Sequence, residues 1–444
     1  MVTNDTLQIN ILNIEMKHRE YFYIGDKTAT GYDYKTIPIE SEDVFDSPLL
    51  ILAFPMKEMG NVGEILSQFG YQSNQDYFFE QCREVISVAE KHQTEKGEGK
   101  ISFQAYFHNF PNSVAEVNDR AIVVVVLHPK TSDSNGPKDY WLTCYIHANV
   151  FDFKDLDGKT HEGFYYNMLR ISGRTEAGEK VYRRKKIFTL VFSVLHSLVD
   201  VYGLHFAYAS MGKENQAIVD ALITNSKKYQ KHFERFSIKN NTIISRFFRR
   251  KSAAAKLVDI TNDEARLREM YHLLNQQTAN YVFQLYHNVE EFLKMINSLK
   301  SYSKTSKVLM TLDTNGNIAA ACVAMNWGDY FQFVLENPKG LFKLVSSMKL
   351  TDHLLYPFCL CGSPEEVNTL LRGVAYNYSK QHKNHLIVMN SYAGDPYAKV
   401  KDSLIFDEYM FFIITDKLDH FNRLKEQSKD SAGNVRFFID NPIL

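Results

Sequence analysis

Short apolar segments alternate with polar turns along the whole chain, and the spacing of the apolar residues changes from one segment to the next. The segment at 121–129 reads AIVVVVLHP, and such a short run of β-branched residues is typical of a strand buried on both faces. Over residues 262–279 the apolar residues recur at helical spacing, which predicts an amphipathic helix. The pattern as a whole predicts a mixed α/β protein.

Capping residues mark the ends of predicted helices in the first half of the chain. Asn74 is placed to begin one helix, and Gly203 is placed to end another. Strands are predicted at 7–16, 48–55, 101–108, 120–128, 140–153, 164–171, 205–211 and 230–238. Helices are predicted at 60–69, 74–90, 187–202 and 214–224.

Similar signals are found in the second half. The residues from Asp313 to Gly316 are typical of a hairpin turn, and Ser363 followed by Pro364 is a typical helix start. Strands are predicted at 256–260, 307–312, 317–326, 330–335, 354–360, 385–389, 409–415 and 435–439. Helices are predicted at 262–279, 289–299, 340–348, 364–382, 396–403 and 419–427.

The two halves repeat one order of elements, although no repeat of individual residues is visible. From residue 255 onward the predicted order is β-α-α-β-β-β-α-β-α-β-β, with the helix at 340–348 as an insertion. A chain of 444 residues is too long for one hydrophobic core, because cores stop growing at about 250–300 residues. We expect an N-terminal extension at 1–48 that packs on the first unit, a first unit at 49–240, a linker at 241–254 and a second unit at 255–444.

Composition narrows the class of protein. Hydrophobic residues make up 45% of the chain and charged residues 23%, as in ordinary globular proteins. The formal net charge of −1 gives no overall attraction to nucleic acid or to an anionic membrane. The 5 cysteines are odd in number and fall in apolar strand-like segments, which favours a reducing compartment. With no signal-peptide pattern and no apolar run of about 18 residues, we expect a cytoplasmic protein without a membrane span.

The order of elements resembles that of the GCN5-related N-acetyltransferase (GNAT) superfamily, present twice in tandem over about residues 49–444. The resemblance implies an α/β fold with a mixed, α+β-type sheet in each unit. It also implies that an acyl-CoA lies between two splayed central strands. Its pyrophosphate would then lie on the amides that begin the helix after the fourth strand, where free N–H groups and the helix dipole favour an anion.

The family motif at this helix start is Arg/Gln-x-x-Gly-x-Gly/Ala, and neither unit keeps it. The first unit has Val181–Thr189, which retains basic residues but has no glycine, so the backbone cannot approach a phosphate as closely. The second has Cys361–Glu366, where Pro364 lacks an amide donor and two glutamates complement the helix dipole. The resemblance therefore favours the first unit, and the implied CoA-binding residues are Arg183, Arg184, Lys185, Lys186 and Asn215.

Each part of that site has a simpler interpretation. Four consecutive cations are often a solvated helix start or a contact with a partner. Asn215 belongs to Glu214–Ala217, which resembles the family's Asn-x-x-Ala stretch only loosely. The basic segment Arg246–Lys251, with Phe247 and Phe248 within it, is interpreted as an interdomain linker rather than a nucleic-acid or membrane contact.

Other candidate residues favour structural roles. Cys359 and Cys361 lack a second Cys or His pair at metal-ligand spacing, so we interpret them as packing residues. Asp155–Gly158 resembles a fragment of a calcium loop but lacks its other ligands, which favours a turn. His147 and His196 stand in apolar surroundings and are predicted to be core histidines.

Tyr397 roughly matches the helix where the family often keeps a tyrosine that acts as an acid, although the chain contains 26 tyrosines. No catalytic residue and no metal ligand is predicted.

The resemblance implies an acyl-CoA-dependent N-acyltransferase, with acetyl-CoA or another acyl-CoA as cosubstrate and a small-molecule or peptide amine as acceptor. A further hypothesis is an aminoacyl or long-chain acyl transferase of the same architecture. The alternative is a non-catalytic binding or scaffold protein that has kept the GNAT fold and lost the cofactor site, as the missing glycines would allow.

Overall fold

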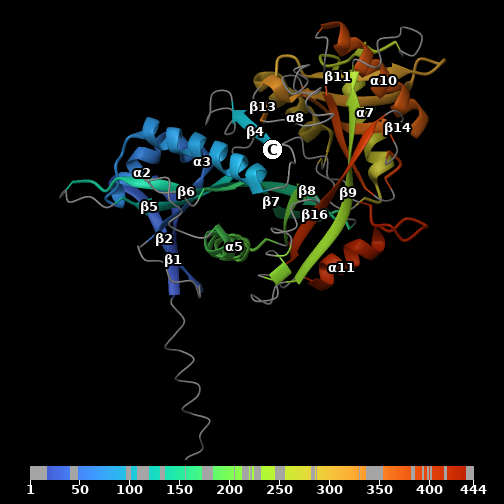
Figure 1. Ribbon diagram of the computed structural model, residues 1–444. Helices are drawn as coiled ribbons and strands as arrows, with labels where there is room; N and C mark the ends of the chain where they lie inside the picture. Colours follow the sequence, from blue (N-terminus) through green and yellow to red (C-terminus); the bar gives the residue numbers. More distant parts are fainter. Residues whose placement is uncertain are drawn as a thin grey trace, which may run out of the picture.

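The computed structural model (Figure 1) describes most of the chain. Its described residues are 18–40, 49–96, 102–107, 120–130, 136–155, 157–172, 184–204, 206–212, 220, 223–224, 232–245, 256–281, 286, 288–329, 331–336, 354–381, 386–392, 395–397, 400, 403–414 and 418–436. Several predicted features lie wholly or mostly outside them, namely the strands at 7–16 and 435–439, the helices at 214–224, 340–348 and 396–403, and the basic segment 246–251.

The first unit begins helices and ends them largely where its capping residues indicate. The Asn74 side chain accepts a hydrogen bond from the Tyr77 amide at the start of α3, and Gly203 follows α5 with a φ of 62°. Its elements are β1 (His18–Thr28), β2 (Gly31–Glu40), β3 (Leu50–Pro55), η1 (Met56–Asn61), α2 (Val62–Gln68), α3 (Gln75–Lys96), β4 (Ser102–Phe107), β5 (Ile122–Pro129), β6 (Tyr140–Lys154), β7 (Thr160–Ile171), α5 (Arg184–Val201), β8 (Phe206–Gly212) and β9 (His232–Ile244).

The described elements of the second unit follow the predicted order. Asp263 and Asn288 cap its first two helices by accepting from the amides of Arg266 and Glu291. Its elements are β10 (Val258–Asp259), α7 (Glu264–Thr278), α8 (Val289–Tyr302), β11 (Lys307–Leu312), β12 (Ile318–Asn326), η4 (Trp327–Asp329), β13 (Phe331–Glu336), β14 (Leu354–Gly362), α10 (Pro364–Gln381), β15 (Leu386–Tyr392), β16 (Leu404–Ile414) and α11 (Leu418–Gln427). The α/β fold class predicted from the sequence is confirmed.

The described strands form one 14-stranded sheet and one 2-stranded sheet. The large sheet has the order β10-β11-β12-β14-β15-β9-β16-β8-β7-β6-β5-β3-β1-β2. In this order each unit contributes one strand to the other, because β9 of the first unit pairs with β15 and β16 of the second unit pairs with β8. The two exchanged strands also pair with each other and cross the middle of the molecule (Figure 1). The second sheet likewise joins β4 to β13 across the units.

Strand exchange corrects one predicted boundary. Residues 241–244, assigned to the linker from sequence, lie in β9 and pair with β15. Their polar composition resembles a turn, but the fully buried Asn241 amide donates to the Ser391 hydroxyl at 2.8 Å and accepts from the Ser403 hydroxyl at 3.2 Å. These hydrogen bonds satisfy a polar side chain inside the sheet. Apart from these four residues, the division of the chain into an extension, two units and a linker remains a prediction.

Both units place helices on the two faces of the sheet. On β5, Val123 and Val125 face the core covered by α2 and α3, whereas Val124 and Val126 face the core covered by α5. The second unit repeats this arrangement, with α7 and α8 on one face and α10 on the other. Burial on both faces explains why these strands are continuous apolar runs instead of alternating ones.

Two additions extend this framework. The β1–β2 hairpin, which the sequence patterns did not predict, joins the sheet edge through β3, where Phe22 pairs with Leu52. Tyr21 is fully buried there, and burial raises the pKa of its hydroxyl to about 12. At the other end of the chain, α11 packs against strands of the first unit, since Phe421 shares a core cluster with Phe153 and Tyr208.

Candidate functional site

The parallel strands β7 and β8 of the first unit separate after a short paired stretch. They pair only from Gly163 with Phe206 to Tyr165 with Tyr208, although β7 continues to Ile171. Beyond Tyr165, β7 remains paired with β6, and β8 remains paired with β16. The sheet therefore opens between β7 and β8.

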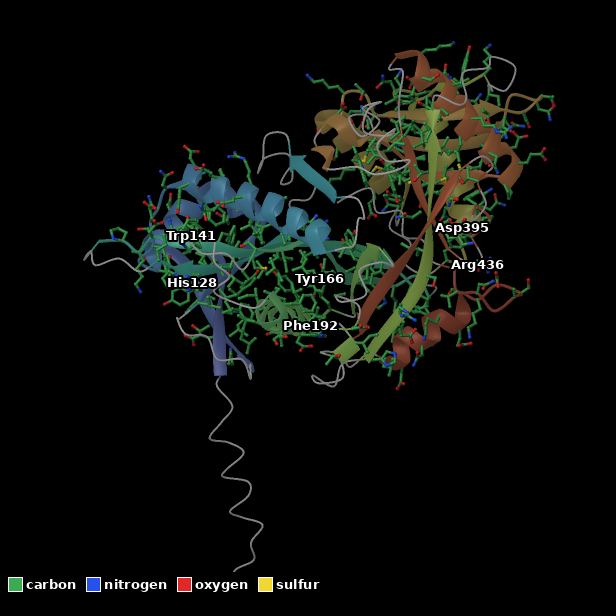
Figure 2. The ribbon with its side chains drawn as sticks, in the orientation of Figure 1. His128, Trp141, Tyr166, Phe192, Asp395 and Arg436 are labelled. Carbon is green, nitrogen blue, oxygen red and sulfur yellow. The ribbon has the colours of Figure 1, made fainter. Side chains whose placement is uncertain are left out.

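A bulge in β7 lies at this opening. Tyr145 of β6 pairs with Arg170, but His147, two residues further on, pairs with Asn167, three residues back. The extra residue on β7 interrupts the ladder and turns the strand. Just before it, the Tyr166 hydroxyl donates to the Leu195 carbonyl oxygen at 2.7 Å, which fixes β7 against α5 (Figure 2).

The second unit has the same device at the corresponding strand. There β14 pairs with β15 only at Leu354 and Leu355, and both strands then continue apart. Opposite β12, the register shifts between Ala321 and Val323, which leaves one extra residue on β14. Cys359, in this bulge, has a φ of 51°, a left-handed conformation that is uncommon for a residue other than glycine. Thus each unit opens beside the bulged strand that precedes a long helix, β7 before α5 and β14 before α10.

The opening of the second unit is closed at its far end by side chains. The Gly362 amide donates to the Gln277 Oε1 atom at 3.0 Å, and the Tyr397 hydroxyl donates to the Gly362 carbonyl oxygen at 2.8 Å. Tyr397 also donates to Gln277 Oε1 at 3.3 Å. Both polar backbone groups at the end of β14 therefore have partners within the protein. Sequence reasoning missed Gln277, since nothing in its own helix indicates a contact with residue 362.

The helices that follow the two openings begin with opposite charges. In the second unit α10 starts with Pro364, Glu365 and Glu366, and the Ser363 hydroxyl accepts from the Glu366 amide at 3.3 Å. In the first unit α5 has no acidic residue in its first turn and starts with Arg184, Lys185 and Lys186. A positive helix terminus with added cations suits an anion, whereas a capped acidic start does not.

The residues predicted to bind CoA are only partly described. Arg184, Lys185 and Lys186 form the first turn of α5, and their side chains lie outside the described part. Arg183 and Asn215 lie wholly outside it. The assignment of these five residues therefore stays a prediction.

The structure confirms the packing roles of other candidates. His147 and His196 are 1% and 5% exposed, as expected for core histidines. Cys359 and Cys361 are free and buried, and burial raises the pKa of the Cys361 thiol to about 12. Such a thiol stays protonated at neutral pH, as suits a cysteine that packs in the core.

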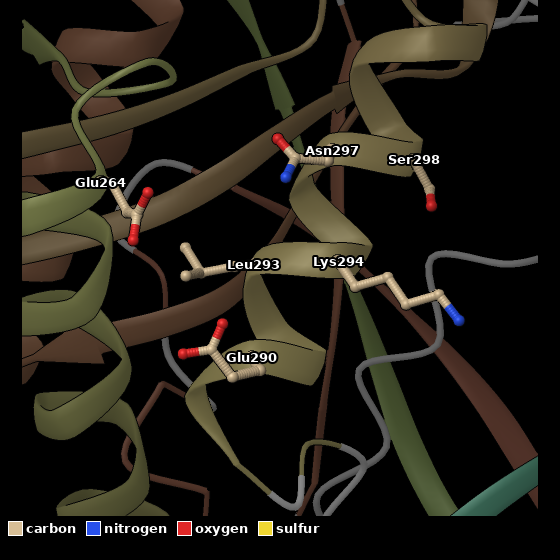
Figure 3. Close-up of a pocket in the computed structure, with 6 residues that line it drawn as sticks. All are labelled: Glu264, Glu290, Leu293, Lys294, Asn297 and Ser298. Atoms are coloured by element: carbon tan, nitrogen blue, oxygen red, sulfur yellow. The ribbon is translucent and has the colours of Figure 1, made fainter.

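A surface groove of about 510 Å³ lies between α7 and α8 (Figure 3). Two of its acids, Glu264 and Glu290, accept from Arg268 at 2.7 and 2.8 Å. Its lining residues are Glu264, Glu290, Leu293, Lys294, Asn297 and Ser298. Since its acids are already paired with an arginine on the protein surface, the groove offers no cluster of catalytic groups.

No protein-family model matches the sequence, and no curated protein matches it either. Solved structures with a similar chain path include N-myristoyltransferase of Saccharomyces cerevisiae with bound myristoyl-CoA, at 11% identity over 93% of this chain and 94% of that one, with a TM-score of 0.46. Another is a conserved protein from Enterococcus faecalis V583, described as a probable N-acyltransferase. It is 11% identical over 84% of this chain and 74% of that one, with a TM-score of 0.40. A GCN5-related N-acetyltransferase from Sphaerobacter thermophilus is 10% identical over 66% of this chain and 79% of that one, with a TM-score of 0.37.

The chain's own topology defines its fold. In the described residues, each unit has a strand and two helices, then a run of strands that ends in a bulged strand (β7 or β14), then a helix, and then a strand that runs parallel to the bulged strand and leaves it. Among the described helices, none has the length and apolar character needed to cross a membrane. This order and pairing of the elements give the protein two GNAT-like folds in tandem, joined through exchanged strands into one sheet.

Proposed function

We propose that this protein transfers an acyl group from an acyl-CoA to an amine, and that the first unit binds the acyl-CoA between β7 and β8. The proposal rests on one difference between the units. The opening of the second unit has both backbone groups of Gly362 bonded by side chains and an acidic helix start. The first unit combines its opening with a basic helix start. The opening of the first unit therefore suits a polyanionic cosubstrate better than the opening of the second unit does.

The cosubstrate would place its thioester in the opening and its pyrophosphate at the start of α5. There the free amides, the helix dipole and the run from Arg183 to Lys186 act on the same anion. Asn215, before β9, is the further proposed contact. Acetyl-CoA or a longer acyl-CoA is the cosubstrate, and the acceptor is an amine of a small molecule or peptide.

The proposed reaction needs little beyond positioning. The unprotonated amine nitrogen attacks the thioester carbon, a C–N bond forms, and the C–S bond breaks. The proton lost by the nitrogen ends on the departing CoA thiol. A backbone N–H of β7 would stabilise the negative charge that develops on the carbonyl oxygen. Holding both reactants in contact supplies much of the remaining acceleration.

Thermal unfolding with added acyl-CoA tests the binding step. Acetyl-CoA and longer acyl-CoAs should raise the melting temperature, because ligands that bind only the folded state stabilise it. The double variant Arg183→Glu with Arg184→Glu should lose this rise. The exposed pair Lys294→Glu with Lys304→Glu changes the net charge equally and should keep it. No rise with any acyl-CoA up to roughly millimolar concentration would refute the proposal.

A non-catalytic GNAT-like binding protein is the second candidate. The absence of glycine from residues 181–189 favours it, since a side chain at each position limits the approach of backbone amides to phosphate. Release of free CoA thiol in the presence of a panel of amines separates the two functions. Acyl-CoA binding without thiol release from any amine would support the binding protein.

A further inference from the structure

We propose that Asp155, His161 and His420 bind a divalent transition metal ion, with Zn²⁺ as the best fit. They lie at the junction of the two units and apart from the opening between β7 and β8. Among the residues that the structure describes, these three are the group of His, Cys, Asp or Glu side chains that converges enough to hold an ion. Their ligand atoms all lie within 4.8 Å of one another.

The spacing of the ligand atoms suits a small ion. His161 Nε2 lies 2.7 Å from Asp155 Oδ2, and His420 Nε2 lies 3.9 Å from the same oxygen. Around tetrahedral Zn²⁺, with bonds of about 2.0–2.2 Å, neighbouring ligand atoms are roughly 3.3 Å apart. Each distance therefore needs to change by only about 0.6 Å. The two imidazoles favour a transition metal, because Ca²⁺ and Mg²⁺ prefer oxygen ligands.

Rigid surroundings hold the three side chains. Asp155 directly follows β6, and its carboxylate accepts from the Lys159 amide at 2.8 Å within the tight turn that the sequence predicted. His161, on β7, stacks on the fully buried Phe153 at a ring distance of 5.4 Å. His420 precedes Phe421, which anchors α11 in the core cluster at the junction. The site would thus require little rearrangement before binding.

Charge and burial also favour a cation here. The Asp155 side chain is fully buried, and those of His161 and His420 are 12% and 18% exposed. A buried carboxylate is costly unless a cation or hydrogen bonds offset it. Two neutral imidazoles can supply nitrogen ligands while Asp155 supplies the negative charge that a divalent ion requires.

Arg423 supplies the sharpest test. Its guanidinium donates to His420 Nδ1 at 2.9 Å. This bond leaves the ring proton on Nε2, the atom that a metal would use, so Arg423 competes with the ion. The Arg423 side chain is 56% exposed and also lies 3.9 Å from the Asp157 carboxylate, so it has an anionic partner when it leaves His420. Its removal should therefore strengthen metal binding if the cluster is a metal site.

Such an ion would join the β6–β7 hairpin of the first unit to α11 of the second. Asp155 and His161 flank the turn between β6 and β7, ahead of the stretch from Gly163 to Tyr165 that pairs with β8, whereas the opening begins after Tyr165. The ion would therefore fix the closed end of β7 and leave the opening accessible. Its proposed role is to hold the two units together.

The experiment uses the full-length protein, first stripped with EDTA and then dialysed. Calorimetric titration with ZnCl₂ should show one ion bound per chain, and Co²⁺ should give the visible absorption bands of four-coordinate cobalt. His161→Asn and His420→Asn should each weaken Zn²⁺ binding more than about 100-fold, since even outer-shell changes cost 10–100-fold. His272→Ala, an exposed histidine on α7, should bind as the wild type does, and Arg423→Gln should bind more tightly.

Two binding results would overturn the proposal. One is the absence of Zn²⁺ binding and of cobalt bands in the wild-type protein. The other is binding that the His161 and His420 variants leave unchanged. If those variants fail to fold, the cobalt spectrum of the wild type and the Arg423→Gln titration still decide the question. The melting temperature gives a third such result. If Arg423→Gln lowers the melting temperature by the same amount with and without Zn²⁺, the cluster of Asp155, His161 and His420 holds no metal ion.

Discussion

The hydroxyl of Tyr397 donates to the carbonyl oxygen of Gly362 at a distance of 2.8 Å. This bond joins the segment after β15 to the end of β14, at the place where these two strands have separated. With Gln277, it closes the opening of the second unit from inside. The same position in the first unit is where we propose that the acyl-CoA lies. Substitutions of Tyr397 and Gly362 therefore test which of the two openings binds the acyl-CoA.

Replacing Tyr397 with phenylalanine should lower stability without affecting acyl-CoA binding. Loss of the hydroxyl removes one hydrogen bond to a backbone carbonyl, which is worth about 1 kcal/mol. Urea unfolding measures the loss, and the thermal shift with acyl-CoA measures binding. A stable variant that no longer responds to acyl-CoA would instead place the cosubstrate in the second unit.

Gly362→Ala should destabilise the protein by about 2–4 kcal/mol. Gly362 has a φ of 123°, which side chains rarely adopt, and an added Cβ would lie 2.5 Å from the Ala319 carbonyl oxygen. Because that oxygen belongs to the backbone of the adjoining strand, it cannot move aside cheaply. The matched control is Gly60→Ala, where an added Cβ meets nothing within 4 Å. Equal unfolding free energies for the two variants would contradict this account.

Asn241→Ala should weaken the exchanged strand. The Asn241 side chain is buried and bonds both Ser391 of β15 and Ser403 before β16. Its removal leaves the buried Ser391 hydroxyl and the half-buried Ser403 hydroxyl without this partner, at a cost of about 2–3 kcal/mol. The exposed Ser237 of the same strand provides the control Ser237→Ala. Equal unfolding free energies of the two variants in urea would show that the Asn241 amide does not stabilise the exchanged strand β9.

Stability should fall at acid pH partly through Asp139. Burial alone raises the pKa of its carboxyl, but hydrogen bonds from Lys130 and from the Tyr140 amide, each 2.8 Å long, outweigh burial and lower that pKa. A carboxyl with a lowered folded pKa stabilises the protein above its unfolded pKa of about 3.9. This stabilisation is lost as the pH falls through the folded pKa.

The variant Asp139→Asn tests this pH dependence. Its stability should decline less steeply than that of the wild type below about pH 4. Urea unfolding at a series of pH values gives the two profiles. Parallel profiles over this range would show that the contacts with Lys130 and Tyr140 do not stabilise the charged carboxyl.

Much of the local structure follows from the sequence because neighbouring residues encode it. The β-branched run of β5 predicts a strand buried on both faces, and its alternate valines do face two separate cores. Asn74 and Gly203 mark helix ends because capping depends on residues within one turn. The turn at Asp155–Gly158 is likewise local, with the Gly158 amide donating to the Asp155 carbonyl oxygen at 3.0 Å.

Three relationships depend on residues far apart in the chain, and only the tertiary structure decided them. These are the exchange of β9 and β16, the contact of Gln277 with Gly362, and the approach of His420 to Asp155. Periodicity and capping report which face of an element is buried and where it ends, but not which distant element covers it. The sequence therefore determined the order of the elements and much of the core, whereas packing between the units determined which opening is closed and which side chains meet at their junction.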